Sequence, residues 1–396
     1  MKRKIAYISE YYSEGMGYTE NCLPRALKKL GYDIRVITSN LQVYAFDRDY
    51  NKIYYSYLGP NQVTPGVYKE KGITIYREKH NRISSYVDIP SIGRTLKRFK
   101  PDIVQIGSPV SILGMRIISM PTKFKVFTEC HQHISVAAHL DGLRRDASMW
   151  PALLWYRLTR TLPGYLESMR VRYCFAISPD CKQVAETHYG YPPNKVVYIP
   201  LGTDTEVFHP PKSTPEFIKR KRVRTELGVS EDEFLIIYTG KFTRAKNPLL
   251  LARAIEKIIE SGIKVKGLFI GDGEQKLLIE EAKGCIVLPF MRHELLSDYY
   301  RSCELAAWPF QESMSMLDAL SSGLPILVSD KMGDLNRVQG VGFTYEEGNL
   351  ESLVYMIRHI IRNIDSQEVS RKAYSYALGK FSWDKVAKQY ASYYES

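Results

Sequence analysis

The apolar residues of the chain gather in short, β-rich runs that alternate with longer amphipathic stretches. A first series of runs lies at 5–9, 33–38, 73–76, 102–106, 125–128, 174–178 and 196–200, and a second lies at 234–240, 265–271, 285–289, 305–309 and 325–330. This alternation is typical of βαβ units, in which helices cover the faces of a parallel sheet. We therefore predict an α/β fold with two Rossmann-like, doubly wound parallel sheets.

The two series are separated by the segment LGTDTEVFHPPKSTP (201–215), which is rich in Pro and Thr and follows neither periodicity. With 396 residues, the chain is long enough for two domains. We predict an N-terminal domain over 1–200, a linker over 201–215 and a C-terminal domain over 216–380. The last amphipathic segment, 381–396, is expected to pack back onto the N-terminal domain. Ligands bind at the carboxyl ends of such strands, so two facing domains would place a site in the cleft between them.

Composition and charge indicate a soluble protein with anionic partners. Charged residues make up 25% and hydrophobic residues 44% of the chain, and the net charge is +12. This charge favours phosphates, anionic lipid surfaces or nucleic acid. No apolar run reaches the ~18 residues of a membrane-spanning helix, and the run near the first residue is too short for a signal peptide. We expect a cytoplasmic protein, with any membrane contact peripheral. The six cysteines lack zinc-ligand spacing and are expected to be reduced.

A basic loop follows the first strand of the second series. Lys241 and Lys246 lie in this loop, directly before a helix that Asn247 and Pro248 begin. Two lysines near the positive end of a helix form a site for a diphosphate. A solvated basic loop is the equal alternative on this segment alone.

The stretch 308–325 lies between two buried strands and carries two acids. Glu312 precedes a turn that begins with Ser313 and Met314, and Asp318 lies on the helix that follows. Backbone N–H groups in such a turn can bind phosphate oxygens, and the carboxylates suit sugar and ribose hydroxyls. Helix capping by Glu312 or Ser313, with Asp318 on a solvated face, is the structural alternative.

Two features of the first half point toward a ligand. Gly15 and Gly17 form a G-x-G loop between a strand and a helix, without the third glycine of a dinucleotide fingerprint. The next strand ends in Thr, Ser and Asn where NAD would require an acid, which disfavours a dehydrogenase. His131 and His133, with His139 nearby, follow another strand, but no ligand set at recognisable spacing completes a metal site. One histidine that reaches a polar ligand is the better hypothesis, with a structural histidine as the alternative.

Two further basic stretches bear on partners. Residues 143–172 interleave arginines with aromatic and aliphatic residues, which suits a lipid interface or, equally, a core-facing helix with a basic outer face. The run 219–224 lacks interleaved aromatic residues and is expected to be a solvated helix face. Nucleic acid is therefore not an expected partner.

Together, the order and spacing of these motifs resemble the retaining glycosyltransferases of family 4, which have the GT-B fold of two facing Rossmann-like domains around a cleft. The resemblance extends over nearly the whole chain. It rests on LKKLGYDIRVITS, ISPDCKQVAETHYGYPPNKVVYIPLGTDTEVFHP, GKFTRAKNP, GDGE, PFQESMSMLDALSSGLPILVSD, VGFTYEEGN and the terminal FSW segment.

The resemblance implies roles for residues of the second half. Lys241 and Lys246 take the positions of the basic pair that holds the donor diphosphate. Asp318 takes the position of the acid that binds the nucleotide ribose, and Glu312 that of the catalytic-site acid facing the transferred sugar. Ser313 and Met314 complete the expected donor-binding set.

In the first half, His131 matches the histidine beside the donor sugar, and Gly15 with Gly17 match the loop near the phosphate and acceptor. The sequence also departs from the family pattern. Lys241 stands where the family usually has Arg, Leu201 stands where it has Asn, and five residues rather than seven separate the two acids. His133 could take the place of His131.

The activity that the resemblance implies is metal-independent transfer of a sugar, with retention, from a nucleoside-diphosphate sugar to an acceptor hydroxyl. No cofactor other than this co-substrate is expected. Polysaccharide or glycolipid biosynthesis at the cell surface, a lipid-linked glycan acceptor and a peripheral position at the inner face of the plasma membrane follow as expectations. A GT-B sugar-nucleotide epimerase and a non-catalytic partner of a glycosylation complex remain the alternatives.

Overall fold

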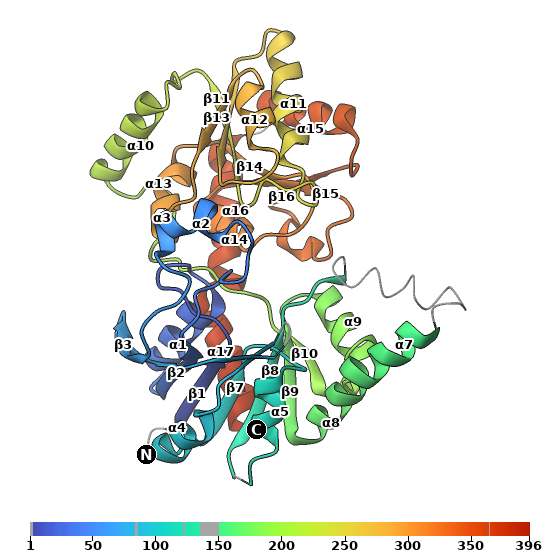
Figure 1. Cartoon of the computed structure of the whole chain (residues 1–396). Helices are drawn as coiled ribbons and strands as arrows, with labels where there is room; N and C mark the ends of the chain where they lie inside the picture. Colours follow the sequence, from blue (N-terminus) through green and yellow to red (C-terminus); the bar gives the residue numbers. More distant parts are fainter. Residues whose placement is uncertain (1–2, 84–85, 122, 135–149, 364) are drawn as a thin grey trace. The chain divides into compact units, whose positions relative to one another are not determined.

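The computed structural model describes residues 3–83, 86–121, 123–134, 150–363 and 365–396. The chain divides into two compact units (Figure 1). The first consists of Met1–Tyr50, Leu58–Leu201 and Trp383–Ser396, and the second of Asn51–Tyr57 and Gly202–Ser382.

The first unit contains an eight-stranded sheet in the order β10-β9-β8-β7-β1-β2-β4-β3. Its strands are β1 (Lys4–Ser9), β2 (Asp33–Ser39), β3 (Gly66–Glu70), β4 (Ile73–Glu78), β7 (Ile103–Ile106), β8 (Lys125–Cys130), β9 (Val171–Ala176) and β10 (Val196–Tyr198). Neighbouring strands are parallel, except that β3 and β4 form an antiparallel pair. A small separate hairpin pairs β5 (Asn81–Ile83) with β6 (Tyr86–Asp88).

Helices cover this sheet and link its strands. They are α1 (Thr19–Lys29), α4 (Ile92–Phe99), α5 (Ile112–Ile118), α7 (Trp150–Tyr156), the π-helical η2 (Arg157–Thr161), α8 (Leu162–Arg170), α9 (Pro179–Thr187), the 3₁₀ turn η3 (Pro193–Lys195) and α17 (Trp383–Glu395). Central strand β1 is buried from Ile5 to Ile8, as expected for a sheet with helices on both faces.

The second unit contains a six-stranded parallel sheet in the order β13-β12-β11-β14-β15-β16. Its strands are β11 (Phe234–Thr239), β12 (Val265–Ile270), β13 (Cys285–Leu288), β14 (Leu305–Trp308), β15 (Ile326–Ser329) and β16 (Gly342–Tyr345). The order reverses beside β11, so the loops after β11 and β14 meet at the switch point where doubly wound sheets bind ligands.

The helices of this unit alternate with its strands. They are α10 (Thr214–Glu226), α11 (Pro248–Glu260), α12 (Lys276–Glu281), η4 (His293–Leu295), α13 (Leu296–Arg301), α14 (Ser315–Ser321), η5 (Leu335–Arg337), α15 (Leu350–Asn363) and α16 (Ser366–Lys380). Two short helices, α2 (Tyr50–Ile53) and α3 (Tyr55–Leu58), flank Tyr54, which belongs to the second unit and whose ring lies 5.8 Å from that of Phe290.

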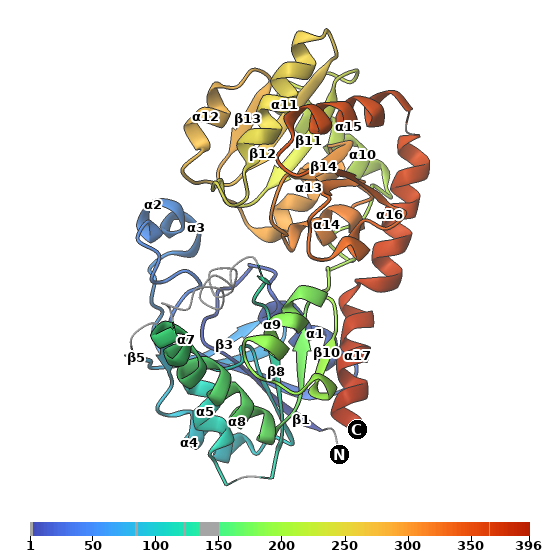
Figure 2. The ribbon, with the colours of Figure 1, turned by 90° about the vertical axis from the view of Figure 1, so that its right-hand side faces the viewer.

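The C-terminal helix α17 packs on the first unit, beside α1 (Figure 2). Its buried Tyr394 donates a hydrogen bond to Gln105 Oε1 over 2.9 Å and lies edge-on to Phe127, with ring centroids 4.9 Å apart. Tyr390 packs against Phe175 in the same way, at 4.6 Å. Aromatic contacts therefore join the last helix to β8 and β9, and a hydrogen bond joins it to β7.

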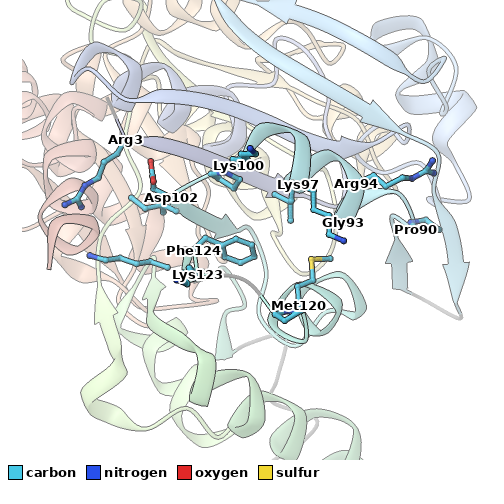
Figure 3. A pocket seen from close by; sticks show the side chains of 15 residues that line it. Arg3, Pro90, Gly93, Arg94, Lys97, Lys100, Asp102, Met120, Lys123 and Phe124 are labelled. Atoms are coloured by element: carbon cyan, nitrogen blue, oxygen red, sulfur yellow. The ribbon is translucent and has the colours of Figure 1, made fainter. Parts of the chain in front are cut away.

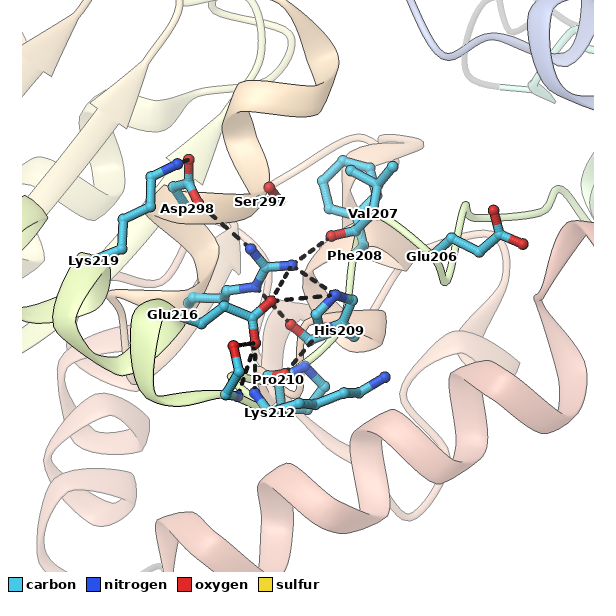
Figure 4. A network of polar contacts seen from close by, with 12 residues as sticks. Glu206, Val207, Phe208, His209, Pro210, Lys212, Glu216, Lys219, Ser297 and Asp298 are labelled. Atoms are coloured by element: carbon cyan, nitrogen blue, oxygen red, sulfur yellow. Dashed lines mark hydrogen bonds and ion pairs between the residues drawn. The ribbon is translucent and has the colours of Figure 1, made fainter. Parts of the chain in front are cut away.

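A cavity opens at the amino-terminal ends of β7 and β8 in the first unit (Figure 3). In the second unit, Arg301 holds the segment that follows Leu201 by donating to the carbonyl oxygens of Val207 over 2.7 Å and His209 over 2.9 Å. Figure 4 shows His209 and Glu216 directed toward the same guanidinium group. This anchoring fixes 207–209 to the second unit.

Candidate active site

The basic loop after β11 is held by close backbone packing. Gly240 N donates to Ile270 O over 3.0 Å, and Phe242 N donates to Asp272 O over 2.8 Å, so the loops after β11 and β12 lie together. A Cβ on Gly271 would lie 1.9 Å from Gly240 O, and one on Gly273 would lie 2.7 Å from Phe242 O. The lysine-bearing loop packs so closely against the turn 271–273 that its first and third residues must be glycine.

The two lysines of this loop are close enough for the charge of one to affect the pKa of the other. Lys246 Nζ donates to Glu312 O over 3.2 Å. Burial lowers the pKa of Lys246 and the charge of Lys241 lowers it further, while Glu312 opposes the shift. Lys241 Nζ lies 5.4 Å from the centre of the Tyr54 ring. A bound anion would relieve the repulsion between the two ammonium groups.

Helix α11 begins after this loop, and its side-chain cap comes from Gln275, whose Oε1 accepts a hydrogen bond from Leu249 N over 3.3 Å. Asn247 occupies the N-cap in the left-handed region (φ 44°) and makes no capping hydrogen bond, contrary to our expectation. Pro248 lies at the first helical position, as predicted. Asn247 tolerates this φ better than most residues, which explains its presence at the bend.

Asp318 is almost fully buried, with 4% of its surface exposed, so the solvated-face alternative is wrong for this residue. Its Oδ1 accepts a hydrogen bond from Thr203 Oγ1 over 2.7 Å, and its Oδ2 lies 2.7 Å from His293 Nε2. The imidazole of His293 is fixed in turn by Phe208, whose ring centroid lies 4.7 Å away. A carboxylate has about four acceptor sites, so these two partners leave capacity for a ligand hydroxyl.

Glu312 is held by two residues of the connection between β15 and β16. Its Oε1 accepts from Asp334 N over 2.7 Å, and its Oε2 lies 3.9 Å from Arg337 Nη2. Arg337 Nη1 also donates to Ser313 O over 3.3 Å. Because the N-cap of α14 is Met314, neither Glu312 nor Ser313 caps this helix by the side chain.

In the first unit, the glycine loop is organised by one acid that sequence reasoning missed. Gly15 and Gly17 have φ values of 75° and 70°, which glycine adopts without strain. Glu70, at the end of β3, accepts from Gly15 N over 3.0 Å and from Asn21 Nδ2 over 3.3 Å, and Tyr12 also donates to it. The loop shape therefore depends on a residue more than fifty positions away in sequence.

His131 is paired with a buried acid. Its Nε2 lies 2.9 Å from Glu129 Oε2, which also accepts from Tyr7 OH over 3.0 Å. Glu129 has no exposed surface, whereas about 35% of the His131 side chain is exposed. A buried carboxylate at this distance fixes the orientation of the imidazole ring.

His133 has different partners, and together with them it forms a group of three residues that could hold a metal ion. Its Nδ1 lies 3.0 Å from Asp180 Oδ2 and 3.7 Å from Cys181 Sγ, and the ligand atoms of the three residues lie within 4.8 Å of one another. Burial alone raises the pKa of Asp180, but hydrogen bonds from His133 and Ser178 hold it well below its usual range. Asp180 and Cys181 are far from His133 in sequence, which is why spacing did not reveal this group.

The predicted site residues therefore fall into two sets. Gly15, Gly17 and His131 belong to the first unit. The second unit contains the set Lys241, Lys246, Glu312, Ser313, Met314 and Asp318. Thr203 and His293 join the second set through Asp318.

The basic stretch of the first unit is described from Trp150 onward, while His139 and residues 143–149 lie outside the described residues. A stripe of eight apolar side chains on α7, η2 and α8 is exposed by 43–70%. These residues, which we call the exposed stripe, are Trp150, Leu154, Trp155, Leu158, Leu162, Tyr165, Leu166 and Met169. The core-facing alternative is wrong for them. In the described part of the chain, no helix is both long and apolar enough to cross a membrane.

Two doubly wound units, with a basic loop after the first strand of the second sheet, define the GT-B class of folds. Comparison with known proteins agrees. The model for Glycosyltransferase Family 4 matches residues 22–207, and the model for Glycosyl transferases group 1 matches residues 233–363. The chain belongs to the glycosyltransferase family that these two models describe together.

Three proteins that are similar to this chain are the following. Sulfoquinovosyl transferase SQD2 of Arabidopsis thaliana is 25% identical over 306 residues, which cover 74% of this chain and 56% of that protein. The putative teichuronic acid biosynthesis glycosyltransferase TuaC of Bacillus subtilis (strain 168) is 24% identical over 353 residues, covering 83% and 82%. The crystal structure of Anabaena Alr3699/HepE in complex with UDP-glucose has a TM-score of 0.68 at 16% identity and covers 98% of both chains. The chain spans 56–62% of the length of three curated relatives, SQD2 among them.

Proposed function

We propose that the protein transfers a sugar, with retention, from a nucleoside-diphosphate sugar to an acceptor hydroxyl, and that it does so without a metal ion. The observation that carries this proposal is the lysine pair after β11, where Lys246 donates to Glu312 O over 3.2 Å and where burial, followed by the charge of Lys241, lowers the pKa of Lys246. Two crowded ammonium groups at the start of the thirteen-residue helix α11 suit a ligand with several negative charges.

The chemistry requires stabilisation of the leaving group. When the bond between the anomeric carbon and the diphosphate breaks, negative charge grows on the diphosphate oxygens. Lys241 and Lys246 offset that charge, which is electrostatic catalysis by preorganised donors. In this proposal, Asp318 accepts hydrogen bonds from the ribose hydroxyls of the donor.

Glu312 and His131 complete the proposed site. Glu312 faces the transferred sugar, and its anchoring by Asp334 N and Arg337 fixes its position before the donor binds. His131, oriented by Glu129, is the other proposed catalytic residue and hydrogen bonds a sugar hydroxyl. Family membership and the similarity to the sulfoquinovosyl transferase SQD2 support a transferase, and the similarity to HepE, which was crystallised with UDP-glucose, makes a UDP-sugar the first donor to try.

The acceptor is proposed to be a glycan or glycolipid at a membrane surface, as part of polysaccharide or glycolipid synthesis. The exposed stripe supports this placement because tryptophan and leucine side chains that line one side of a helix suit the interface of a bilayer. Arginines on the same segment and the net charge of +12 would favour anionic lipid.

A donor screen tests the proposal. The unfolding temperature is measured with UDP-, GDP- and ADP-sugars, since a ligand that binds only the folded state raises it by mass action. The best donor is then incubated with acceptor sugars and lipids, and the products are separated. We expect a stabilising donor and a glycosylated acceptor with the anomeric configuration retained, in the presence of EDTA. Release of free epimerised sugar, or binding without turnover across the acceptor panel, would overturn the transferase assignment.

A further inference from the structure

The first unit contains a cavity of about 850 Å³ at the amino-terminal edge of its sheet, within the usual size range of small-molecule sites (Figure 3). Lys125 is the first residue of β8 and lines this cavity, whereas His131 follows the last residue of the same strand. Six residues of extended strand span roughly 17–20 Å, so the cavity is separate from the site described above.

The inner wall of the cavity is apolar. Leu96, Ile103 and Phe124, each no more than 6% exposed, form it together with Met120. Figure 3 shows Met120 directed toward Gly93, where a Cβ would lie 3.3 Å from the Met120 methyl carbon. No hydroxyl or amide side chain is among the described residues that line the cavity. Such a wall offers nothing to a sugar or a base and suits a hydrocarbon chain.

The rim of the cavity is strongly basic. Its cations are Arg3, Arg94, Lys97, Lys100, Lys123 and Lys125. Asp102 is the one acid among the described lining residues, and its Oδ2 accepts from Lys4 N over 2.7 Å.

Arg3 forms an ion pair with Glu395 over 2.8 Å, but several of the other cations are not neutralised in this way. Within the described chain, none of Lys97, Lys100 and Lys123 forms an ion pair. Lys125 Nζ donates to the carbonyl oxygens of Tyr394 and Ser396, over 3.1 and 2.8 Å. Partial burial, with the charges of Arg172 and Arg3, lowers the pKa of Lys125. An anion at the rim would therefore be attracted by several charges at once.

We propose that this cavity binds a single-chain lipid phosphate, with its phosphate at the basic rim and its alkyl chain against Phe124 and Met120. The apolar wall favours the alkyl chain of the ligand, and the lysines without an ion pair favour its phosphate. Neither part of this surface alone would distinguish the ligand from a neutral detergent or from free phosphate.

The test is a calorimetric titration of the full chain with dodecyl phosphate below its micelle concentration. Inorganic phosphate and dodecyl maltoside are titrated under the same conditions. We expect dodecyl phosphate to bind at least tenfold more tightly than either. If inorganic phosphate matches it, the site binds only an ion, and if the maltoside matches it, the site is only an apolar groove. Binding to anionic vesicles without binding to the monomeric probe would indicate a membrane surface. Each of these three results overturns the proposal.

Variants locate the binding. Gly93→Leu should displace Met120 into the cavity and weaken dodecyl phosphate binding at least tenfold, while Gly93→Ala meets only the flexible end of Met120 and should retain it. The double change Lys97→Gln with Lys123→Gln alters exposed residues, which keeps the test valid should Gly93→Leu fail to fold. It should also weaken binding at least tenfold.

The matched control is Lys385→Gln with Lys388→Gln, which removes the same charge from exposed positions on α17 that do not line the cavity. This control should bind as the unchanged protein does. An equal loss in the control would mean that binding follows net charge rather than the cavity, which contradicts the proposal.

Discussion

The hydroxyl of Thr203 donates a hydrogen bond to Asp318 over 2.7 Å, across 115 positions of sequence. With His293 on its other oxygen, Asp318 joins the segment after Leu201 to the turn before α13. Asp318, the proposed ribose-binding acid, therefore also stabilises the second unit through its two hydrogen bonds. Its two functions can be separated by changing the acid and the threonine independently.

Asp318→Asn should weaken binding of a nucleoside diphosphate at least tenfold and lower the free energy of unfolding by about 1.5–3 kcal/mol, because a neutral amide replaces a charged acceptor in a buried site. Thr203→Val should cost about 1 kcal/mol and change the affinity by less than threefold, since the carboxylate remains. Urea unfolding and nucleotide titration measure both quantities. If Asp318→Asn binds normally, the acid is only structural.

Gly271→Ala should destabilise the second unit, because a Cβ at this position would lie 1.9 Å from Gly240 O. The clash is with backbone, so we expect a loss of about 3 kcal/mol or more and weaker donor binding, since the lysine-bearing loop must shift. Gly379→Ala is the control. It adds a methyl group to helix α16 where no atom lies within 4 Å, and should be neutral or stabilising by up to about 1 kcal/mol. Equal unfolding midpoints for the two variants would be incompatible with the packing described.

The buried Glu167 makes stability depend on pH. Burial raises its pKa to about 7, although the hydrogen bond from Val110 N, 2.7 Å long, lowers it in part. Between the unfolded value near 4.5 and about 7, the folded state retains a proton that the unfolded chain releases. The contribution of Glu167 is therefore favourable at low pH and is lost as pH rises through this window, by on the order of 2–3 kcal/mol.

Glu167→Gln retains an acceptor for Val110 N but does not titrate. Its free energy of unfolding, relative to the unchanged protein, should increase as pH rises from 4.5 to 7. Chemical unfolding at several pH values measures this difference. Glu260→Gln changes an exposed residue and serves as the control. Parallel pH profiles for Glu167→Gln and the unchanged protein would show that the carboxyl is ionised at low pH in the folded state.

The exposed stripe should mediate attachment to anionic membranes. Trp150→Ser with Trp155→Ser removes its two most interfacial side chains, 64% and 70% exposed, and should reduce sedimentation with anionic vesicles about tenfold or more at low salt. Phe217→Ser with Ile218→Ser removes exposed apolar residues of α10 instead, and should leave sedimentation unchanged. If both double variants sediment equally, the exposed stripe does not mediate attachment, and any attachment comes from net charge.

Much of the fold could be predicted because the parallel strands are buried on both faces and therefore read as continuous apolar runs. Strand β3 was missed because its side chains are mostly exposed and its run GVYKE carries little apolar signal. The positions of Lys241 and Asp318 could be predicted because both follow strands of one parallel sheet.

Their partners could not be predicted in the same way. Glu70, Glu129 and His293 each act through a contact that the topology brings together, with no local spacing to reveal it. Glu312 shows the same limit. Its sequence position indicates a sugar-facing acid, but its anchoring by Asp334 and Arg337 depends on the connection between β15 and β16. Such contacts between distant residues form only when the chain folds, so the sequence pattern around one residue does not reveal them.

We expect Lys246 to bind the donor diphosphate, and a comparison of two ligands in two variants tests this role. The dissociation constants of a nucleoside diphosphate and of its nucleoside are determined for Lys246→Gln and for Lys283→Gln, which changes an exposed lysine of the same unit. We predict that Lys246→Gln weakens the diphosphate at least tenfold and leaves the nucleoside within about twofold, whereas Lys283→Gln changes neither. An unaltered preference for the diphosphate in Lys246→Gln would show that Lys246 does not bind the diphosphate.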